Sequence, residues 1–543
     1  MKKFLLSCFL TVYATLSFAD NYPKNPKIDV LNYAFRIELS DESDQIKCEA
    51  TIDVRYVGEG VQKLRLDLVK SSQKLGNKGM TVSKVMSAGK ELSFTHENDS
   101  LLINLPVPSK AQQRSTFKIT YSGIPASGLK IANNKYGERT FFSDNWPNLG
   151  RNWLSVVDHP YDKATSEFII IAHAHYQVVS NGLKVEESDL PGGLRLTHWK
   201  QSIPVSSWLY VLGVARFAVQ QVDKFDNKAL ETWVYHQDRD AGFYDFAVPT
   251  KQALEFYSNY VGPFVYEKLA NIQSNSVSGG MEAASAILYS ETSVVGDRNE
   301  RWRNVVIHEV AHQWFGNSVT EYDWDDVWLS EGFATYFTLL FIEHAYGRDA
   351  FQEGLAGSKR TIDSFHAKNP SYQIVHDNLK DMNQVVTSHT YQKGSWTLHM
   401  LRGVVGNDYF WKGIRSYYSK YMNSTATTSD FRREMEEASG MDLKEFFDQW
   451  LYKPGALQYN GSWQYDDKTK EIKIKIDQIQ TDGSLFKMPV QLAIYSSTAK
   501  PVIKTLQVNE KQNEFTISFD KAPESIVFDP DNWVLVEAKW GKK

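Results

Sequence analysis

The spacing of the hydrophobic residues changes twice along this chain, and this change limits the folds that it can adopt. From about residue 28 to residue 217 apolar residues alternate with polar ones, as in Tyr33, Phe35 and Ile37. Strict alternation indicates strands that bury one face, and turn-rich spacers such as Pro191–Gly193 separate these runs. The first part of the chain is therefore predicted to be an antiparallel β domain.

After about residue 218 apolar residues recur at spacings of three and four, which indicates helices. The segments with this spacing are 250–260, 301–316, 331–346 and 430–452. Alternation returns past Pro454 in Ile472, Ile474 and Ile476, which predicts a small terminal β domain. We therefore expect a multidomain α+β protein whose mature chain divides into residues 20–217, 218–455 and 456–543.

Length and charge narrow the classes of function. A chain of 543 residues is long enough for several domains. Its charged fraction is 23% and its net charge is −5, so basic residues do not outnumber acidic ones. Nucleic-acid binding is therefore not expected. Past the first residues no apolar stretch is long enough to cross a bilayer, and stable membrane insertion is not expected either.

The first residues have the pattern of an export signal. Lys2–Lys3 form a short basic region, Phe4–Phe18 is almost wholly apolar, and a small-x-small pattern ends the segment. We therefore predict a signal peptide at residues 1–19, a mature chain that begins at Asp20, and a periplasmic or secreted protein. A lipoprotein cleavage site at Cys8 is disfavoured, because too little apolar sequence precedes it.

The helical middle contains the run His308-Glu309-Val310-Ala311-His312, an H-E-x-x-H sequence. On an α-helix residues i and i+4 share one face, so the two imidazoles can bind one metal ion. Glu309 lies to one side and can approach a metal-bound water without being a ligand. A surface helix with two solvated histidines would also fit these five residues, so the motif needs a third ligand.

Glu331 is the candidate for that ligand, within the segment WLSEGFA at residues 328–334. A carboxylate flanked by apolar residues is unfavourable unless something pairs with it, and a metal would do so. Two histidines and one glutamate leave one position open for water, as in catalytic zinc sites. We therefore predict one Zn²⁺ per chain on His308, His312 and Glu331. Zinc would activate the water, with Glu309 as general base.

Longer segments resemble a known family. HEVAHQWFGN at 308–317, followed by WLSEGFA, resembles the gluzincin zinc aminopeptidases of the aminopeptidase N and leukotriene hydrolase type. Ser278–Ala283 is similar to the G-A-M-E-N motif, Tyr391–Gly394 to Y-x-K-G, and Phe446–Trp450 to F-F-x-Q-W. The resemblance implies a thermolysin-like, mainly helical catalytic domain. It also implies a bacterial-like short form without the helical C-terminal domain of many relatives.

The resemblance also implies residue roles. Glu282 is expected to bind the free α-ammonium of a peptide, with Gly279, Gly280 and Met281 beside the substrate. Tyr391 is expected to donate a hydrogen bond to the oxyanion. The implied function is a zinc metallo-aminopeptidase that hydrolyses N-terminal residues from peptides with a free N-terminus.

Two departures concern the amine site. Ala283 stands where the family has Asn. Relatives often supply a second amine-binding Gln or Glu from the first domain, and the corresponding neighbourhood here contains Asp144, Trp146 and Pro147. Asp144 could take this role, whereas Trp146 or Pro147 could occupy the same place.

Alternative functions remain open at this stage. An epoxide hydrolase on the same scaffold would need a lipid channel that sequence does not reveal, and a non-catalytic peptide-binding relative would not need the full ligand set. An endopeptidase is disfavoured by Glu282. His173 and His175 share one face of a predicted strand, but no third ligand is near in sequence. His389 lies close to Tyr391 and is given no role. Nothing in the sequence sets the oligomeric state.

Overall fold

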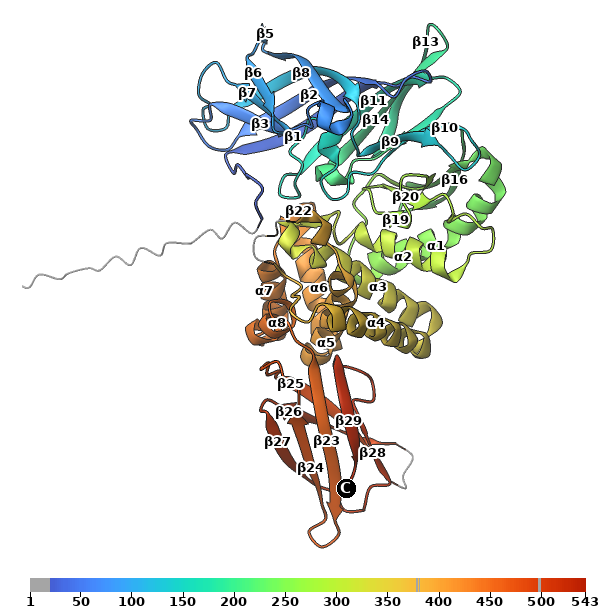
Figure 1. Ribbon diagram of the computed structural model, residues 1–543. Helices are drawn as coiled ribbons and strands as arrows, with labels where there is room; N and C mark the ends of the chain where they lie inside the picture. Colours follow the sequence, from blue (N-terminus) through green and yellow to red (C-terminus); the bar gives the residue numbers. More distant parts are fainter. Residues whose placement is uncertain (1–19, 377–378, 380, 497–499) are drawn as a thin grey trace, which may run out of the picture.

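The computed structural model describes residues 20–376, 379, 381–496 and 500–543. It consists of β-sheets at one end, helices in the middle and further β-sheets at the other end (Figure 1). The predicted α+β fold class is confirmed. The predicted signal peptide at 1–19 lies outside the described residues. The domain boundaries stay predictions; next to them the chain passes from strand to strand at residues 215–217 and from helix to strand at residues 451–457.

The largest sheet lies in the N-terminal part and has eight strands in the order β13-β14-β11-β1-β2-β8-β4-β5. These are β1 (Ile28–Glu38), β2 (Ile46–Tyr56), β4 (Gly79–Ser87), β5 (Lys90–Glu91), β8 (Arg114–Ile124), β11 (Ala164–His173), β13 (Leu183–Leu190) and β14 (Leu194–Val205). Tyr33, Phe35 and Ile37 are buried as their alternation predicts. The prediction of a wholly antiparallel domain is wrong at one place, because β1 and β11 pair in parallel. Local alternation does not specify a strand's partner.

Two smaller sheets complete this part. One has the order β12-β15-β10-β9 and the other β3-β7-β6. Their strands are β12 (Gln177–Ser180), β15 (Leu212–Ala215), β10 (Arg139–Ser143), β9 (Leu129–Asn133), β3 (Lys63–Asp67), β7 (Ser100–Asn104) and β6 (Phe94–Glu97).

The middle of the chain combines a five-stranded sheet, in the order β16-β17-β18-β20-β19, with eight α-helices among the described residues. The strands are β16 (Phe217–Phe225), β17 (Lys228–Tyr235), β18 (Lys268–Ser274), β20 (Ala286–Ser290) and β19 (Gly280–Met281), and a separate pair joins β21 (Val319–Glu321) to β22 (Ser424–Ala426). The helices are α1 (Arg239–Tyr260), α2 (Glu300–His312), α3 (Trp328–Tyr346), α4 (Arg348–Lys368), α5 (Gly394–Val405), α6 (Asn407–Tyr421), α7 (Thr428–Ser439) and α8 (Lys444–Leu451).

Short helical turns connect these elements. A π-helical turn, η7 (His389–Lys393), leads directly into α5. The 3₁₀ turns are η1 (Gln73–Leu75), η2 (Gly150–Asn152), η3 (Ser207–Leu209), η4 (His236–Asp238), η5 (Trp324–Asp326) and η6 (Met382–Gln384).

Two predicted helices are shorter in the structure. The helix predicted at 301–316 ends at His312. The one predicted at 430–452 is two helices, because Gly440 adopts a left-handed φ of 72° that ends α7. The apolar residues of α7 and α8 belong to the same hydrophobic core. For this reason their spacing of three and four residues continues past the end of α7.

The C-terminal part contains two sheets, in the orders β27-β24-β23-β29 and β26-β25-β28. Their strands are β23 (Leu457–Asp466), β24 (Glu471–Gln478), β25 (Met488–Tyr495), β26 (Val502–Val508), β27 (Gln512–Ser518), β28 (Ser525–Phe528) and β29 (Val536–Lys542). Among the described residues, no helix has the length and apolar character needed to cross a membrane.

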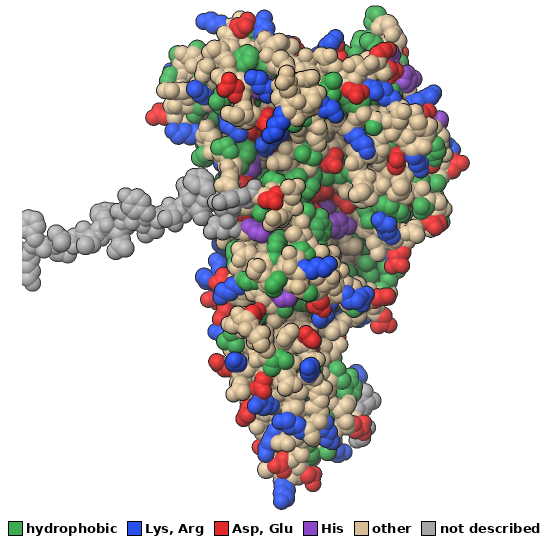
Figure 2. Space-filling view, viewed as in Figure 1, with side chains coloured by type: hydrophobic (Ala, Val, Ile, Leu, Met, Phe, Trp, Pro, Cys, Tyr) green, Lys and Arg blue, Asp and Glu red, His purple; other side chains and the backbone are tan. Residues whose placement is uncertain are grey.

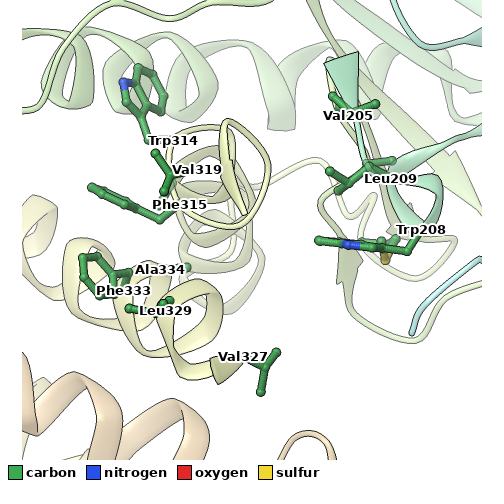
Figure 3. Close-up of a cluster of buried hydrophobic side chains, with 14 of the residues drawn as sticks. Val205, Trp208, Leu209, Trp314, Phe315, Val319, Val327, Leu329, Phe333 and Ala334 are labelled. Carbon is green, nitrogen blue, oxygen red and sulfur yellow. The ribbon is translucent and has the colours of Figure 1, made fainter. Parts of the chain in front are cut away.

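Apolar packing sets the positions of α2 and α3. Phe315, just after α2, packs with its ring centroid 4.9 Å from Phe333 and 4.6 Å from Phe337 of α3. Figure 3 shows Phe315 and Phe333 facing one another, with Trp208 of the N-terminal part across from them. Because this cluster is buried, the two helices are held at a defined distance and orientation.

Candidate metal centre

Helices α2 and α3 bring together the three predicted ligands. The Nε2 atoms of His308 and His312 lie 3.1 Å apart. Oε2 of Glu331, in the first turn of α3, lies 3.4 Å from Nε2 of His308 and 3.3 Å from Nε2 of His312. His308 and His312 converge because they are one helical turn apart, as the sequence predicts.

This arrangement fits a small divalent ion. A tetrahedral ion with ligand bonds of about 2.0–2.2 Å holds its ligand atoms roughly 3.3–3.5 Å apart, close to the distances among these three residues. Oε2 of Glu331 is buried, and in the described part of the chain it has no hydrogen-bond partner. A buried oxygen of this kind is expected where a ligand or ion completes the site.

His312 is oriented by the residues around its other ring nitrogen. Nδ1 lies 3.1 Å from the Phe315 carbonyl and 3.1 Å from Oγ of Ser330. Gly316 has a left-handed φ of 108°, and a Cβ there would overlap Ser330. Contacts at Nδ1 leave Nε2 directed at the other two candidate ligands, which is how outer-sphere groups orient a metal-binding histidine.

Glu309 and Glu282 lie on the other side of His312. Three atoms all lie within 4.8 Å of one another: a carboxylate oxygen of Glu282, a carboxylate oxygen of Glu309 and a ring nitrogen of His312. Glu309 is buried against Gly280, where a Cβ would overlap its carboxylate. Glycine at position 280 is therefore required for Glu309 to lie where it does.

The loop that carries Glu282 is held by its backbone. The Glu282 carbonyl accepts hydrogen bonds from Nε2 of Gln313 at 3.0 Å and Nδ2 of Asn317 at 2.6 Å. Oε1 of Glu282 lies 3.9 Å from Nδ1 of His312, and it is buried with no hydrogen-bond partner among the described residues. The loop and the end of α2 thus form one unit, with the Glu282 side chain left free to bind.

Residues Gly280 and Met281 form an edge strand beside this centre. β19 is the outermost strand of its sheet, and within the described chain it pairs with β20 alone, Gly280 opposite Tyr289 and Met281 opposite Leu288. The Gly279 carbonyl accepts a hydrogen bond from the Ser290 amide at 2.8 Å. An edge strand leaves backbone groups for an extended peptide to pair with.

Tyr391 contacts two of the candidate ligands. Its hydroxyl donates to Oε1 of Glu331 at 2.7 Å, and its ring stacks on His308 at 6.2 Å between centroids. Tyr391 lies on η7, which approaches α3 closely where Gly394 faces Gly332. The two glycines of the predicted motifs thus allow the tyrosine to reach the centre.

The centre is rich in buried negative charge. Glu282, Glu309 and Glu331 form no ion pair with a lysine or arginine in the part of the chain that the structure describes. Burial raises the pKa of Glu282 to about 7 and that of Glu309 well above its ordinary value. Burial alone would lower the pKa of His312, but Glu282 and Glu331 outweigh it and raise the pKa to about 10. The site therefore favours cations.

The same feature is visible on the surface. Figure 2 shows histidine and acidic side chains gathered in a recess between the N-terminal sheets and the helices. Asp144, on the loop after β10, adds to this charge, because it helps raise the pKa of Glu282. Trp146 instead packs its ring against Trp208 and Trp324 at 5.0 and 4.9 Å.

Among the described residues, two other groups have the donor atoms to hold a metal. Asp20, His159 and Asp323 are buried together, but Nζ of Lys24 lies 3.0 Å from Asp20 and 2.6 Å from Asp323 and supplies the positive charge. In the other group, Oδ2 of Asp41 lies 3.8 Å from Nε2 of His173 and 3.6 Å from Nε2 of His175. Asp41 is far from the two histidines in sequence, where no third ligand was found.

Three supporting residues were missed by sequence reasoning. Gln313, Asn317 and Ser330 lie within the two recognised segments, but their hydrogen bonds to Glu282 and His312 depend on the packed fold. Their place inside a motif was the available signal. His389 packs against Phe365 of α4, with ring centroids 4.6 Å apart.

Comparison with known proteins places this geometry in a family. Residues 30–209 match the Peptidase M1 N-terminal domain, and residues 246–450 match the Peptidase family M1 domain. The chain belongs to peptidase family M1. The second match includes every predicted site residue of this M1 chain, from Gly279 to Tyr391.

Individual relatives of the M1 chain are distant. It is 26% identical to a probable aminopeptidase 1 of Sulfurisphaera tokodaii over 87% of this chain and 59% of that protein. It is 30% identical to human glutamyl aminopeptidase over 59% of this chain and 35% of that protein. It thus spans less than two thirds of the length of each of these relatives.

A solved structure shares the fold. Legionella pneumophila aminopeptidase A, in complex with aspartic acid, superimposes with a TM-score of 0.79 at 20% identity, over 95% of this chain and 60% of that chain. At this identity the likeness concerns the fold alone.

Proposed function

We propose that this M1 chain is a zinc metallo-aminopeptidase that removes N-terminal residues from peptides. The observation that carries the proposal is the Glu282 carboxylate, which is buried beside the ligand triad. Among the residues that the structure describes, no lysine or arginine pairs with it, and its Oε1 has no hydrogen-bond partner. A buried carboxylate needs a counter-charge. The free α-ammonium of a peptide supplies one, whereas an internal peptide bond does not.

One zinc ion per chain would be held by His308, His312 and Glu331. When bound, zinc supplies a Lewis acid that polarises a peptide carbonyl and makes water easier to deprotonate. The choice of zinc over other divalent ions is supported by the two imidazole ligands and by the short distances among the three ligand atoms.

Glu309 is proposed to move the proton. Its carboxylate takes a proton from the attacking water and passes it to the nitrogen of the leaving amine, so that the carboxylate is regenerated. Tyr391 keeps its own proton, because burial and Glu331 raise its pKa well above the ordinary value. Its hydroxyl thus remains a donor for the oxygen of the scissile carbonyl as negative charge develops there.

Substrate binding would use the edge strand and the acidic recess. An extended peptide can pair with the backbone around Gly279 and Gly280, while Glu282 binds its ammonium group. Asp144 is the candidate for the second amine-binding carboxylate, since its charge acts on Glu282 from the N-terminal part. Met281, the second residue of this strand, has a buried side chain.

We also propose that the protein is exported to the periplasm or secreted after removal of residues 1–19. The basic and apolar pattern of that segment supports this. Detection of the protein, with Asp20 as its first residue, outside the cytoplasm of the producing cell would test it.

The decisive experiment compares an aminoacyl reporter that has a free α-amine with its N-acetylated form. We expect the free form to be cleaved at least a hundredfold faster in kcat/KM, because acetylation removes the charge that Glu282 binds. Equal cleavage of both would refute the aminopeptidase. Neither the epoxide hydrolase nor the non-catalytic alternative is supported by a specific feature of the site.

A further inference from the structure

A cavity lies between the helices and the C-terminal sheets, beside η7. Its volume is ≈ 450 Å³, within the usual range for small-molecule sites. Helix α4, the turn η7 and the first residues of β23 and β29 surround it. None of the residues proposed for catalysis lines it, and no family match or sequence motif assigns it a ligand.

His389 lines this cavity with unsatisfied polar atoms. It is fully buried, and neither of its ring nitrogens makes a hydrogen bond of normal length and angle among the described residues. The Ile362 backbone offers the imidazole only a weak hydrogen bond. Its ring neighbours are Phe365, Tyr372 at 5.7 Å and, at 6.2 Å and nearly parallel, His366. A buried polar group without a partner is unfavourable and indicates that something else binds there.

Lys393 lines the same cavity with a poorly compensated charge. Its exposed fraction is 2%, and its Nζ makes one long hydrogen bond, 3.3 Å to the Gly455 carbonyl. No carboxylate pairs with it in the described chain. By contrast, the fully buried Lys268 donates to two carbonyls, of Ser180 at 2.9 Å and Ser285 at 3.2 Å.

The acidic residues around the cavity already have partners. Asp363 pairs with Lys359 at 2.7 Å, and Glu537 accepts from Gln458 at 3.2 Å. Gln458 carries no charge, but Glu537 is exposed and its carboxylate is solvated, whereas Lys393 is buried. The buried charge at the cavity that lacks a counter-charge is therefore positive. The remaining wall is apolar, formed by Ile362, Trp450, Leu457 and Leu535. This combination suits a ligand with a negative group at one end and an apolar group at the other.

We propose that this cavity binds a small organic carboxylate that has an apolar group. Its carboxylate accepts hydrogen bonds from Nζ of Lys393 and from an imidazole N–H of His389. Its apolar group lies against Trp450 and Leu457. This proposal stands independently of the aminopeptidase, since it invokes no residue of the metal centre.

The test measures binding of 4-phenylbutanoate to the full purified chain by titration calorimetry, with tryptophan fluorescence as a second signal because Trp450 lines the site. The uncharged 4-phenylbutan-1-ol is the control ligand. We expect saturable binding of one phenylbutanoate per chain and at least tenfold weaker binding of the alcohol.

Variants locate the site. Lys393→Met removes the ammonium but keeps the length of the side chain, and Ala456→Trp fills the cavity from its β23 side. Each should weaken binding at least tenfold, whereas Lys473→Met, on an exposed position of β24, should not. The melting temperature of each variant shows that it is folded. Absence of saturable binding to the wild type, equal binding of the alcohol, or binding that survives either substitution would overturn the proposal.

Discussion

The contact between Gly280 and Glu309 shows how a single missing side chain positions a reactive group. Gly280 belongs to the edge strand, Glu309 to α2, and a Cβ at position 280 would occupy the space of the carboxylate. To avoid this overlap, the Glu309 carboxylate would have to turn away from the candidate ligands. Displacements of this size are enough to impair a positioned base.

Gly280→Ala is therefore expected to lower kcat at least tenfold while changing the melting temperature little. Gly279→Ala is the matched variant, because a Cβ there meets nothing within 4 Å. Its kcat should stay near the wild-type value, although KM can change beside the substrate. Steady-state kinetics of both variants with one aminoacyl reporter would check this, and equal kcat values would contradict it.

Glu309→Gln separates proton transfer from metal binding. The amide keeps nearly the same shape but cannot accept the proton, so kcat should fall by about 10²–10⁴-fold. Bound zinc, measured by elemental analysis, should remain at the wild-type level, because Glu309 is not among the three converging ligands. A variant that retains its kcat would exclude Glu309 as the base.

Helix α3 and the turn η7 meet through glycines, at the scale of whole elements. A Cβ at Gly332 would lie 3.1 Å from the carbonyl carbon of Gly394 and 3.2 Å from the carbonyl oxygen of Thr390. Both neighbours are backbone atoms, which cannot rotate away. The separation of α3 and η7 in turn sets how Tyr391 reaches Glu331.

We expect Gly332→Ala to lower the free energy of unfolding by roughly 1–3 kcal/mol through overpacking, and to lower kcat as well. Gly357→Ala on α4 is the control, since a Cβ there lies 3.7 Å from its nearest neighbour, the Arg360 side chain. That substitution should be neutral or stabilising. Urea titrations would measure the free energy of unfolding of both variants. Similar losses in the two variants would contradict the claim that a side chain at position 332 is excluded by the backbone of η7 and α5.

These elements also show what the sequence could predict. His308 and His312 could be assigned from a helix alone, because their spacing is a local property. Asp41 could not be assigned to His173 and His175, since long-range pairing brings it near them. The parallel pairing of β1 with β11 was missed for the same reason. Within the centre, ligand types were predictable, whereas the hydrogen bonds of Gln313 and Ser330 required the packed helices.

Metal binding should stabilise the molecule as a whole. An ion that binds only the folded chain adds about 2.7 kcal/mol when its concentration is 100 times its dissociation constant. Removing metal with a chelator should therefore lower the melting temperature, and adding zinc should restore it. In Glu331→Gln, which lacks one ligand, the chelator should have a much smaller effect. Calorimetric melts of both proteins with and without chelator would measure this.

The pH dependence of stability should reflect Asp162, which lies in the N-terminal part. Burial raises its pKa from the ordinary 3.8 to about 7, although the Val30 amide donates to its Oδ1 at 3.4 Å. Because the folded state holds this proton more tightly than the unfolded state, stability declines as pH rises from about 3.8 to 7 and then stays level.

Asp162→Asn removes this titration and keeps an oxygen for the Val30 amide. The variant should gain stability over the wild type as pH rises, up to roughly 4 kcal/mol above pH 7. Melting temperatures of both proteins at pH 5 and pH 8 would test it. If the melting temperature rose by the same amount at pH 5 and at pH 8, ionisation of Asp162 would not explain how stability changes between these pH values.

The way in which the Glu282 loop is held has a consequence for protein engineering. Gln313 and Asn317 bind its main-chain carbonyl, which any amino acid would present equally well. Side chains that fit the buried space at position 282 can therefore be exchanged in a library while the loop keeps both of these hydrogen bonds. Selection on substrates with blocked or altered amino ends would then amount to redesigning the preference of the enzyme through a single codon.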